Sequence, residues 1–135
     1  MNESGGQPLK PEEAIMAVLF MARTSDGRVP VREDESFLSK IKRSRTLRPL
    51  GERGLIALES SVANRLSKIS LQEACGAVPL ELRAPLFAHA FDLLLADGEL
   101  NEAEADFSNA LILALGLNRT DVERIADVIA LKNQL

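Results

Sequence analysis

The sequence predicts an all-α, single-domain bundle of about six to seven helices, built from two similar helix–loop–helix halves. Apolar residues recur at helical spacing, and no segment alternates in the way that a half-buried strand does. Helix start and stop signals divide the chain repeatedly, and one such pattern occurs twice. Apolar residues make up 46% of the 135 residues but aromatic residues only 4%, so aliphatic side chains must form most of the core.

The first part of the chain contains three expected helices. Residues 1–11 are rich in Gly, Pro and Ser and are expected to be a disordered lead-in, which places the folded domain at residues 12–135. Pro11 and the acids after it open a helix that extends to about Ser25, and Asp26-Gly27 is a stop signal. Further helices are expected at about 30–42 and 51–69. The last of these should bury Leu55, Ile56, Leu58, Val62 and Leu66.

The second part is divided by caps. Ser70 with Glu73 predicts a capping box for a short helix that Gly76 ends. A long helix follows at about 79–96, and Asn101 with Glu104 starts another that extends to Leu115. Gly116-Leu117 fits a Schellman ending, after which Asn118 caps the last helix. The buried face of that helix is expected to contain Val122, Ile125, Val128, Ile129 and Leu131.

One pattern recurs when the chain is aligned with itself at an offset of 71 residues. Asp26-Gly27 then falls on Asp97-Gly98, and Glu33 falls on Glu104. In each copy an apolar helix is followed by Asp-Gly, an apolar residue, a Glu and a second apolar helix. Two such units are expected to pair their apolar faces about a pseudo-two-fold axis, because one unit alone would leave a face exposed.

The repeated unit resembles the second half of an EF-hand calcium loop, but the first half is missing. The earlier ligand positions are held by Ala22, Thr24, Leu93 and Leu95, which do not supply the oxygens that a standard EF-hand needs. A looser site for a hard divalent cation, calcium, magnesium or manganese, is the functional interpretation. Its metal ligands would be Asp97, Glu104, Asp26 and Glu33.

A second interpretation of the same residues is purely structural. Asp and Gly end one helix, and a Glu at the third position of the next helix accepts a free backbone N–H group. Helix capping therefore accounts for every residue of the unit without a metal. Both interpretations remain open on the sequence.

Two stretches carry a family resemblance. Residues 90–117, AFDLLLADGELNEAEADFSNALILALGL, and residues 17–41, AVLFMARTSDGRVPVREDESFLSKI, resemble the TerB-like tellurite-resistance domain. The same domain type occurs attached to a membrane-anchored J-domain co-chaperone. The resemblance spans roughly residues 12–135 and implies an all-helical fold of two pseudo-symmetric halves with a divalent-metal site at the four acids above. It also implies a role in stress response, a membrane-associated protein partner and no enzymatic activity.

Composition and charge argue against several classes of function. A formal net charge of −4 argues against nucleic-acid binding, which needs a basic footprint. The single Cys75 cannot form an intrachain disulfide, and no nucleophile–base pair or fingerprint of an organic cofactor is present. The longest uncharged stretch, residues 107–118, is shorter than the about 20 residues that a transmembrane helix needs. A cytoplasmic, non-enzymatic protein is the resulting expectation.

An alternative function uses the basic segment at residues 40–53. It would be a metal-free helical adaptor or scaffold that docks this segment on a protein partner or an anionic membrane surface. The segment's cationic residues are Lys40, Lys42, Arg43, Arg45, Arg48 and Arg53.

The lone His89 is interpreted as a partly buried helix residue, and the lone Cys75 as a small buried residue.

Overall fold

A computed structural model describes residues 8–25, 44–95 and 100–134. The all-α prediction is confirmed, because these residues form six α-helices and two short 3-10 helices and contain no strand. The helix expected at 30–42 and residues 1–7 of the expected lead-in lie outside the described residues. The elements are α1 (Pro11–Arg23), η1 (Arg48–Leu50), α3 (Gly51–Arg65), η2 (Leu66–Lys68), α4 (Leu71–Gly76), α5 (Leu80–Leu94), α6 (Glu102–Leu115) and α7 (Arg119–Lys132).

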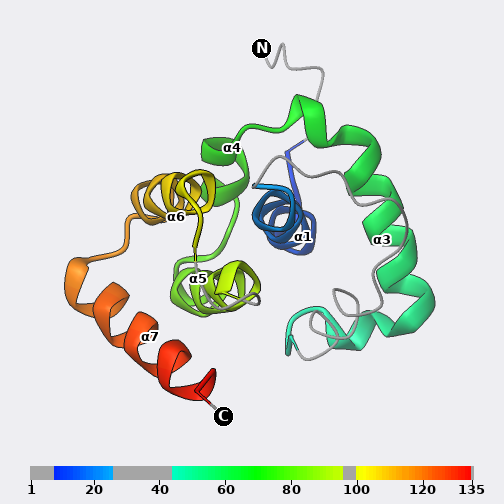
Figure 1. The fold of residues 1–135 in the computed structure, drawn as a ribbon. Helices are drawn as coiled ribbons and strands as arrows, with labels where there is room; N and C mark the ends of the chain where they lie inside the picture. The colour runs from blue at the N-terminus through cyan, green and yellow to red at the C-terminus, as the bar shows by residue number, and fades with distance from the viewer. Residues whose placement is uncertain (1–7, 26–43, 96–99, 135) are drawn as a thin grey trace.

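Helix α1 lies at the centre of the fold (Figure 1). It contacts α3, α4, α5 and α6, so little of its circumference faces solvent. Between Glu13 and Arg23 the chain carries no charged residue, which is the composition of a helix that is buried on every side. Its buried residues are Ala14, Ile15, Met16, Ala17, Val18, Leu19 and Ala22.

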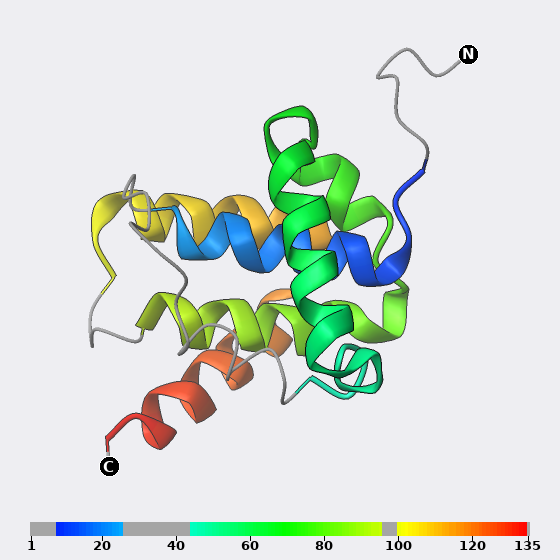
Figure 2. The same ribbon diagram turned by 90° about the vertical axis from the view of Figure 1, so that its right-hand side faces the viewer.

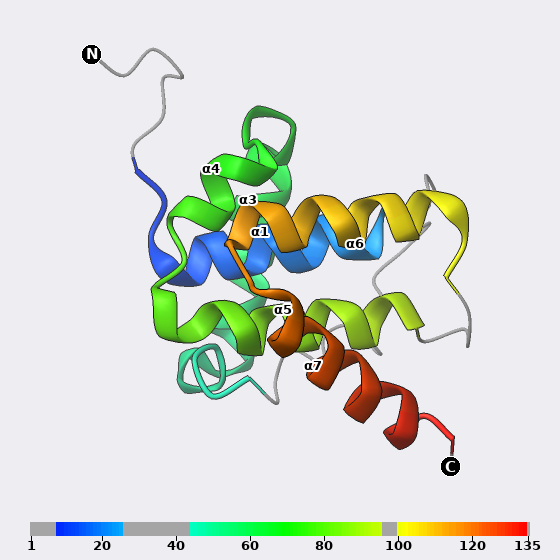
Figure 3. The ribbon, with the colours of Figure 1, turned by 90° about the vertical axis from the view of Figure 1, so that its left-hand side faces the viewer.

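Helices α5 and α6 lie along the direction of α1, whereas α3 crosses it (Figure 2). Helices α1 and α5 run in the same direction, and α6 runs opposite to both (Figure 2). Helix α7 crosses α5 on the outside of the molecule and packs against it (Figure 3). Because α1 and α5 are the first helices of the two repeat copies, their mutual packing is what the pairing of halves requires. The pseudo-two-fold relation itself stays a prediction, since the first copy's second helix lies outside the described residues.

The caps form as the sequence indicates. In the Ser70–Glu73 box the Glu73 amide donates to the Ser70 hydroxyl at 3.0 Å, and the Ser70 amide donates to the Glu73 carboxylate at 3.2 Å. Gly116 has φ 69° and ψ 33°, the left-handed conformation that ends helices. The amide after it, from Leu117, donates to the Ile112 carbonyl at 3.2 Å, which completes the Schellman motif.

Helix α1 ends slightly earlier than expected, at Arg23. The hydroxyl of Thr24 donates to the Phe20 carbonyl at 3.0 Å, and that of Ser25 donates to the Ala22 carbonyl at 2.8 Å. These two side chains satisfy carbonyls of the last turn, so the helix finishes before Asp26-Gly27 is reached.

Three expected core residues are exposed. Ile56 is 42% exposed because the face of α3 that meets α1 is formed by Leu55, Glu59 and Val62, and Ile56 is rotated away from that line. Val128 and Leu131 are 58% and 68% exposed. Helix α7 packs mainly on α5, so only a narrow stripe of it is covered.

In the parts of the chain that the structure describes, every helix lacks the length or the apolar character needed to cross a bilayer.

Candidate functional site

Glu104 is the one predicted metal ligand that lies in a described part of the chain, and it caps α6. Its amide donates to the Asn101 side-chain oxygen at 2.7 Å, and its carboxylate Oε1 accepts the Asn101 amide at 2.9 Å. Glu104 is half-buried, and its other oxygen, Oε2, has no hydrogen-bond partner among the described residues. The cap therefore fixes the orientation of the carboxylate and leaves one oxygen available.

Asp26, Glu33 and Asp97, the other three predicted ligands, lie outside the described residues. The structure therefore neither brings them to Glu104 nor separates them from it. Within 8–25, 44–95 and 100–134, no group of three or more His, Cys, Asp or Glu side chains is placed to hold a metal ion. A cation site that joins the two acidic loops stays a prediction.

Glu73 and Glu13 share the capping position of Glu104, because each is the third residue of its helix. Glu73 matches Glu104 in using Oε1 for a backbone amide while no described group engages Oε2. Only Glu104 has an aspartate seven residues before it; the corresponding position before Glu73 is Leu66. Glu73 is therefore an internal reference for a capping glutamate outside the repeated acidic loop.

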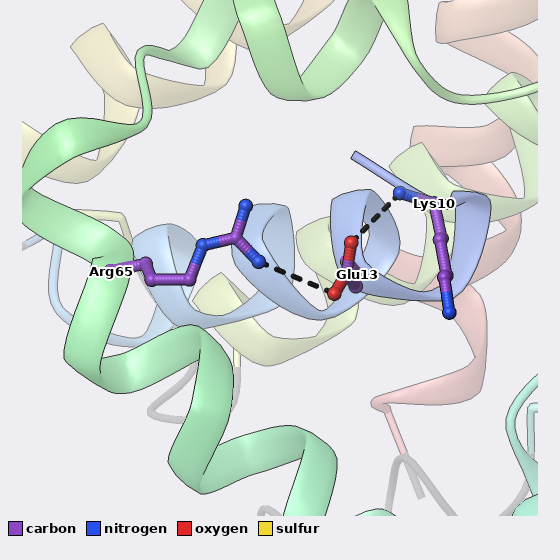
Figure 4. Close-up of polar contacts among 3 residues, drawn as sticks. All are labelled: Lys10, Glu13 and Arg65. Carbon is purple, nitrogen blue, oxygen red and sulfur yellow. Dashed lines mark hydrogen bonds and ion pairs between the residues drawn. The ribbon is translucent and has the colours of Figure 1, made fainter. Parts of the chain in front are cut away.

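Glu13 shows what the second oxygen of such a cap can do (Figure 4). Its Oε1 accepts the Lys10 amide at 2.9 Å, and its Oε2 lies 3.3 Å from Nη1 of Arg65 on α3. Lys10 has no side-chain acceptor, so only this half of a capping box is formed. One carboxylate thus caps a helix and holds a cation at the same time.

The lone cysteine is unsuited to redox or nucleophilic chemistry. Cys75 is fully buried in α4. Burial raises the pKa of its thiol to about 11, although the positive charge of Arg83 acts in the opposite direction. The group stays a protonated thiol at neutral pH, whereas the reactive form of cysteine is the thiolate. This agrees with the prediction of a small buried residue.

His89 lies on α5 near an ion pair between α5 and α7. The Lys132 ammonium is 2.8 Å from the Asp92 carboxylate. His89 as a whole residue is exposed, but atoms packed around its ring partly exclude water from it. This desolvation lowers the pKa of His89 below its ordinary value. Asp92 raises this pKa and Lys132 lowers it. Because its pKa lies below 6.5, the imidazole of His89 is mainly neutral at pH 7.

The basic segment, as far as it is described, forms a mixed surface at the start of α3. Arg45, Arg48 and Arg53 are all exposed. Two large apolar side chains are exposed in the same stretch, Leu50 at 38% and Ile56 at 42%. The residues of this segment that precede Ser44 lie outside the described part of the chain. Exposed aliphatic groups among arginines are typical of surfaces that meet an acidic partner or lipid headgroups.

A pocket of about 400 Å³ lies between α1, α5 and residues 44–46. Sequence reasoning missed it, because its wall combines residues from three separate segments. The sequence shows one irregularity here, Pro85 inside the long helix, but an interior proline does not by itself indicate a pocket. The polar lining residues are Ser44, Arg45, Thr46 and His89, and the apolar ones are Ile15, Leu19, Leu82, Pro85 and Leu86.

The fold and these side chains define a class of protein, a small helical domain in which a central apolar helix is enclosed by its neighbours and glutamate carboxylates accept the backbone N–H groups at the start of three helices. The family model described as "Tellurite resistance protein TerB" matches residues 12–127, and the chain belongs to this family. The resemblance drawn from the sequence is thereby confirmed. No curated protein and no solved structure matches the chain.

Proposed function

We propose that this TerB-family chain is a non-enzymatic stress-response domain of the cytoplasm that binds a divalent cation and docks on a protein partner. The cation would be calcium, magnesium or manganese, held by Asp97 and Glu104 of one acidic loop and Asp26 and Glu33 of the other. Membership of the family supports the stress-response assignment.

The orientation of Glu104 is the observation that carries the metal half of the proposal. Hard cations take carboxylate oxygens, and a ligand costs less to order when its direction is already fixed. Oε1 of Glu104 is held by the Asn101 amide at 2.9 Å, while no residue that the structure describes hydrogen-bonds to Oε2. Capping and metal binding are therefore compatible in one side chain, as the combined use of Glu13 by Lys10 and Arg65 illustrates.

Binding rather than reduction is the route by which such a domain would act in tellurite resistance. Reduction of tellurite needs an electron donor, and the only thiol, Cys75, is buried with its pKa raised to about 11. A single protonated thiol supplies neither a dithiol couple nor a reactive thiolate. The proposal accordingly assigns the domain a binding or scaffolding role.

Calorimetric titration of the full chain with calcium, magnesium, manganese and zinc tests the metal half. We expect heat of binding for at least one hard cation, and at least about a tenfold loss of affinity in a variant with Asp97→Asn and Glu104→Gln. Gln at position 104 preserves the cap, so this variant should stay folded. Wild type that shows neither heat nor thermal stabilisation at millimolar ion would rule out the metal half.

Glu73→Gln is the matched control. It reproduces the Glu104→Gln half of the double variant at the same helix position but outside the acidic repeat. Cation affinity should equal that of wild type. An equal loss in both variants would mean that the cation is bound diffusely by surface carboxylates.

A second candidate function is a metal-free adaptor that docks through the basic segment, and the exposed Leu50 and Ile56 favour it. Both large apolar side chains sit in the stretch that carries exposed Arg48 and Arg53. Membrane-surface binding draws on buried apolar area together with electrostatic attraction to anionic lipid.

Vesicle co-sedimentation distinguishes this candidate from the first. Wild type should bind vesicles that contain phosphatidylglycerol and not vesicles of phosphatidylcholine alone, and Arg48→Glu with Arg53→Glu should abolish binding. Arg119→Glu with Arg124→Glu on α7 changes the net charge equally at exposed positions and serves as control. Equal loss with both double variants would reject the basic segment as the docking surface.

A further inference from the structure

The pocket between α1, α5 and residues 44–46 has one apolar wall. Ile15 and Leu19 of α1 and Leu82 and Leu86 of α5 contribute aliphatic side chains, and the ring of Pro85 completes it. Its volume of about 400 Å³ lies within the range of small-molecule sites, about 300–1,000 Å³. An alkyl chain is the ligand group that such a wall accommodates, because it offers no hydrogen-bond partner that the wall would leave unsatisfied.

The other side of the pocket is polar and has unused capacity. Ser44 is buried, and its hydroxyl accepts the Leu47 amide at 3.3 Å. By contrast, the side chains of Arg45, Thr46 and His89 form no hydrogen bond or ion pair with any described residue. Three polar groups thus line a cavity without partners among the described residues, which is the arrangement of a site with a few convergent polar contacts.

The charge of the lining sets the charge of the ligand. Arg45 brings a guanidinium cation to the lining, and no Asp or Glu is among the described lining residues. On α5, the carboxylate of Asp92 accepts hydrogen bonds from the Lys132 ammonium. An anion of single charge is complementary to this pocket, and the planar guanidinium favours a carboxylate.

We infer that this pocket binds a medium-chain carboxylate, with the alkyl chain against the wall formed by α1 and α5 and the head group at Arg45. This goes beyond the proposed function, since it requires neither the acidic loops nor a metal. Thr46 and a neutral His89 supply additional hydrogen bonds to the carboxylate. Arg48 and Arg53, which define the basic surface at the start of α3, take no part.

Calorimetric titration with sodium octanoate, octanol and sodium acetate separates the contribution of the chain from that of the head group. Octanoate should bind at least about tenfold more tightly than octanol, and acetate should give no heat. Decanoate should bind about tenfold more tightly than octanoate, because two more methylene groups leave water. Absence of octanoate binding, or equal affinity for octanoate and octanol, would overturn the inference.

Variants locate the site. Arg45→Gln should reduce the affinity for octanoate to that for octanol, whereas Arg48→Gln, an exposed arginine outside the pocket, should leave it unchanged. Leu82→Phe should fill the pocket and weaken both ligands at least about tenfold. Equal effects of the two arginine variants would indicate diffuse attraction and reject the site.

Pro85→Phe keeps the test decisive if Leu82→Phe unfolds. Pro85 is an exposed lining residue, and its replacement restores a backbone N–H inside α5, so this variant should fold. It should also weaken octanoate binding by narrowing the entrance. Wild-type affinity in both filled variants, shown to be folded by circular dichroism, would place the ligand elsewhere and overturn the inference.

Discussion

Helices α1 and α7 have nearly equal lengths, 13 and 14 residues, but opposite positions in the fold. Helix α1 is surrounded by four helices and its central turns are buried. Helix α7 packs mainly on α5 and contains no buried residue. Their charges differ accordingly, since α1 has none between Glu13 and Arg23, whereas α7 carries Arg119, Asp121, Glu123, Arg124, Asp127 and Lys132.

The two helices should therefore contribute unequally to the stability of the domain. A buried side chain that is shortened leaves a cavity that the surrounding helices cannot fill completely, whereas a half-exposed one leaves space that water occupies. The core therefore depends on α1, and α7 adds a peripheral layer. The following predictions test this ranking.

Shortening one side chain in each helix should give the largest contrast. Met16 of α1 is fully buried, so Met16→Ala should lower the free energy of unfolding by about 2–5 kcal/mol. Ile125 of α7 is half-buried, so Ile125→Ala should cost about 1 kcal/mol. Urea denaturation followed by far-UV circular dichroism measures both. Equal losses would show that α7 belongs to the core after all.

The ion pairs of the two helices should differ in the same direction. Arg23 of α1 and Glu59 of α3 are 3.9 Å apart with side chains 11% and 12% exposed. Glu59→Gln removes the negative charge that faces the nearly buried Arg23 guanidinium. It should lower the free energy of unfolding by about 1–3 kcal/mol.

The Lys132–Asp92 pair is shorter, at 2.8 Å, but its side chains are 53% and 23% exposed. Lys132→Met should therefore cost less than about 1 kcal/mol, because exposed pairs are screened by water. Thermal and urea unfolding of the two variants compare them directly. A larger loss for Lys132→Met would mean that distance outweighs burial here.

The smallest expected effect reports whether α7 sits on α5 in solution. Because Lys132 lowers the pKa of His89 and Asp92 raises it, Lys132→Met should move the pKa upward, toward the ordinary value of about 6.5. His89 is the only histidine of the chain, so its NMR titration needs no assignment. An unchanged pKa would contradict the docked position of α7.

Much of the fold could be predicted because its signals are local. The caps at Ser70, Asn101 and Gly116 depend on hydrogen bonds within a few residues, and each forms as expected. Leu55 and Val62 of α3 are buried as expected, but the core-facing position of Glu59 next to Arg23 could not be predicted from the pattern of apolar residues. Ile56 lies outside this buried face and is exposed.

The candidate sites also differ in whether local sequence signals predict them. The capping role of Glu104 follows from its spacing to Asn101, whereas its metal role depends on acids from two loops far apart in sequence. The pocket was beyond sequence reasoning, because Leu19, Arg45 and His89 meet only after three segments have packed together. The spacing of residues within one helix does not indicate which side chains of separate segments will line the same pocket.

The enclosure of α1 also affects how the chain is made. Helix α1 emerges from the ribosome before α5 and α6, two of the helices that cover it, have been synthesised. The apolar surface of α1 therefore stays partly uncovered until α5 and α6 have been synthesised, and the native domain can form only late in translation. Stalled nascent chains that end before Leu80 should be digested rapidly by added protease, and those with Leu115 outside the exit tunnel should resist it.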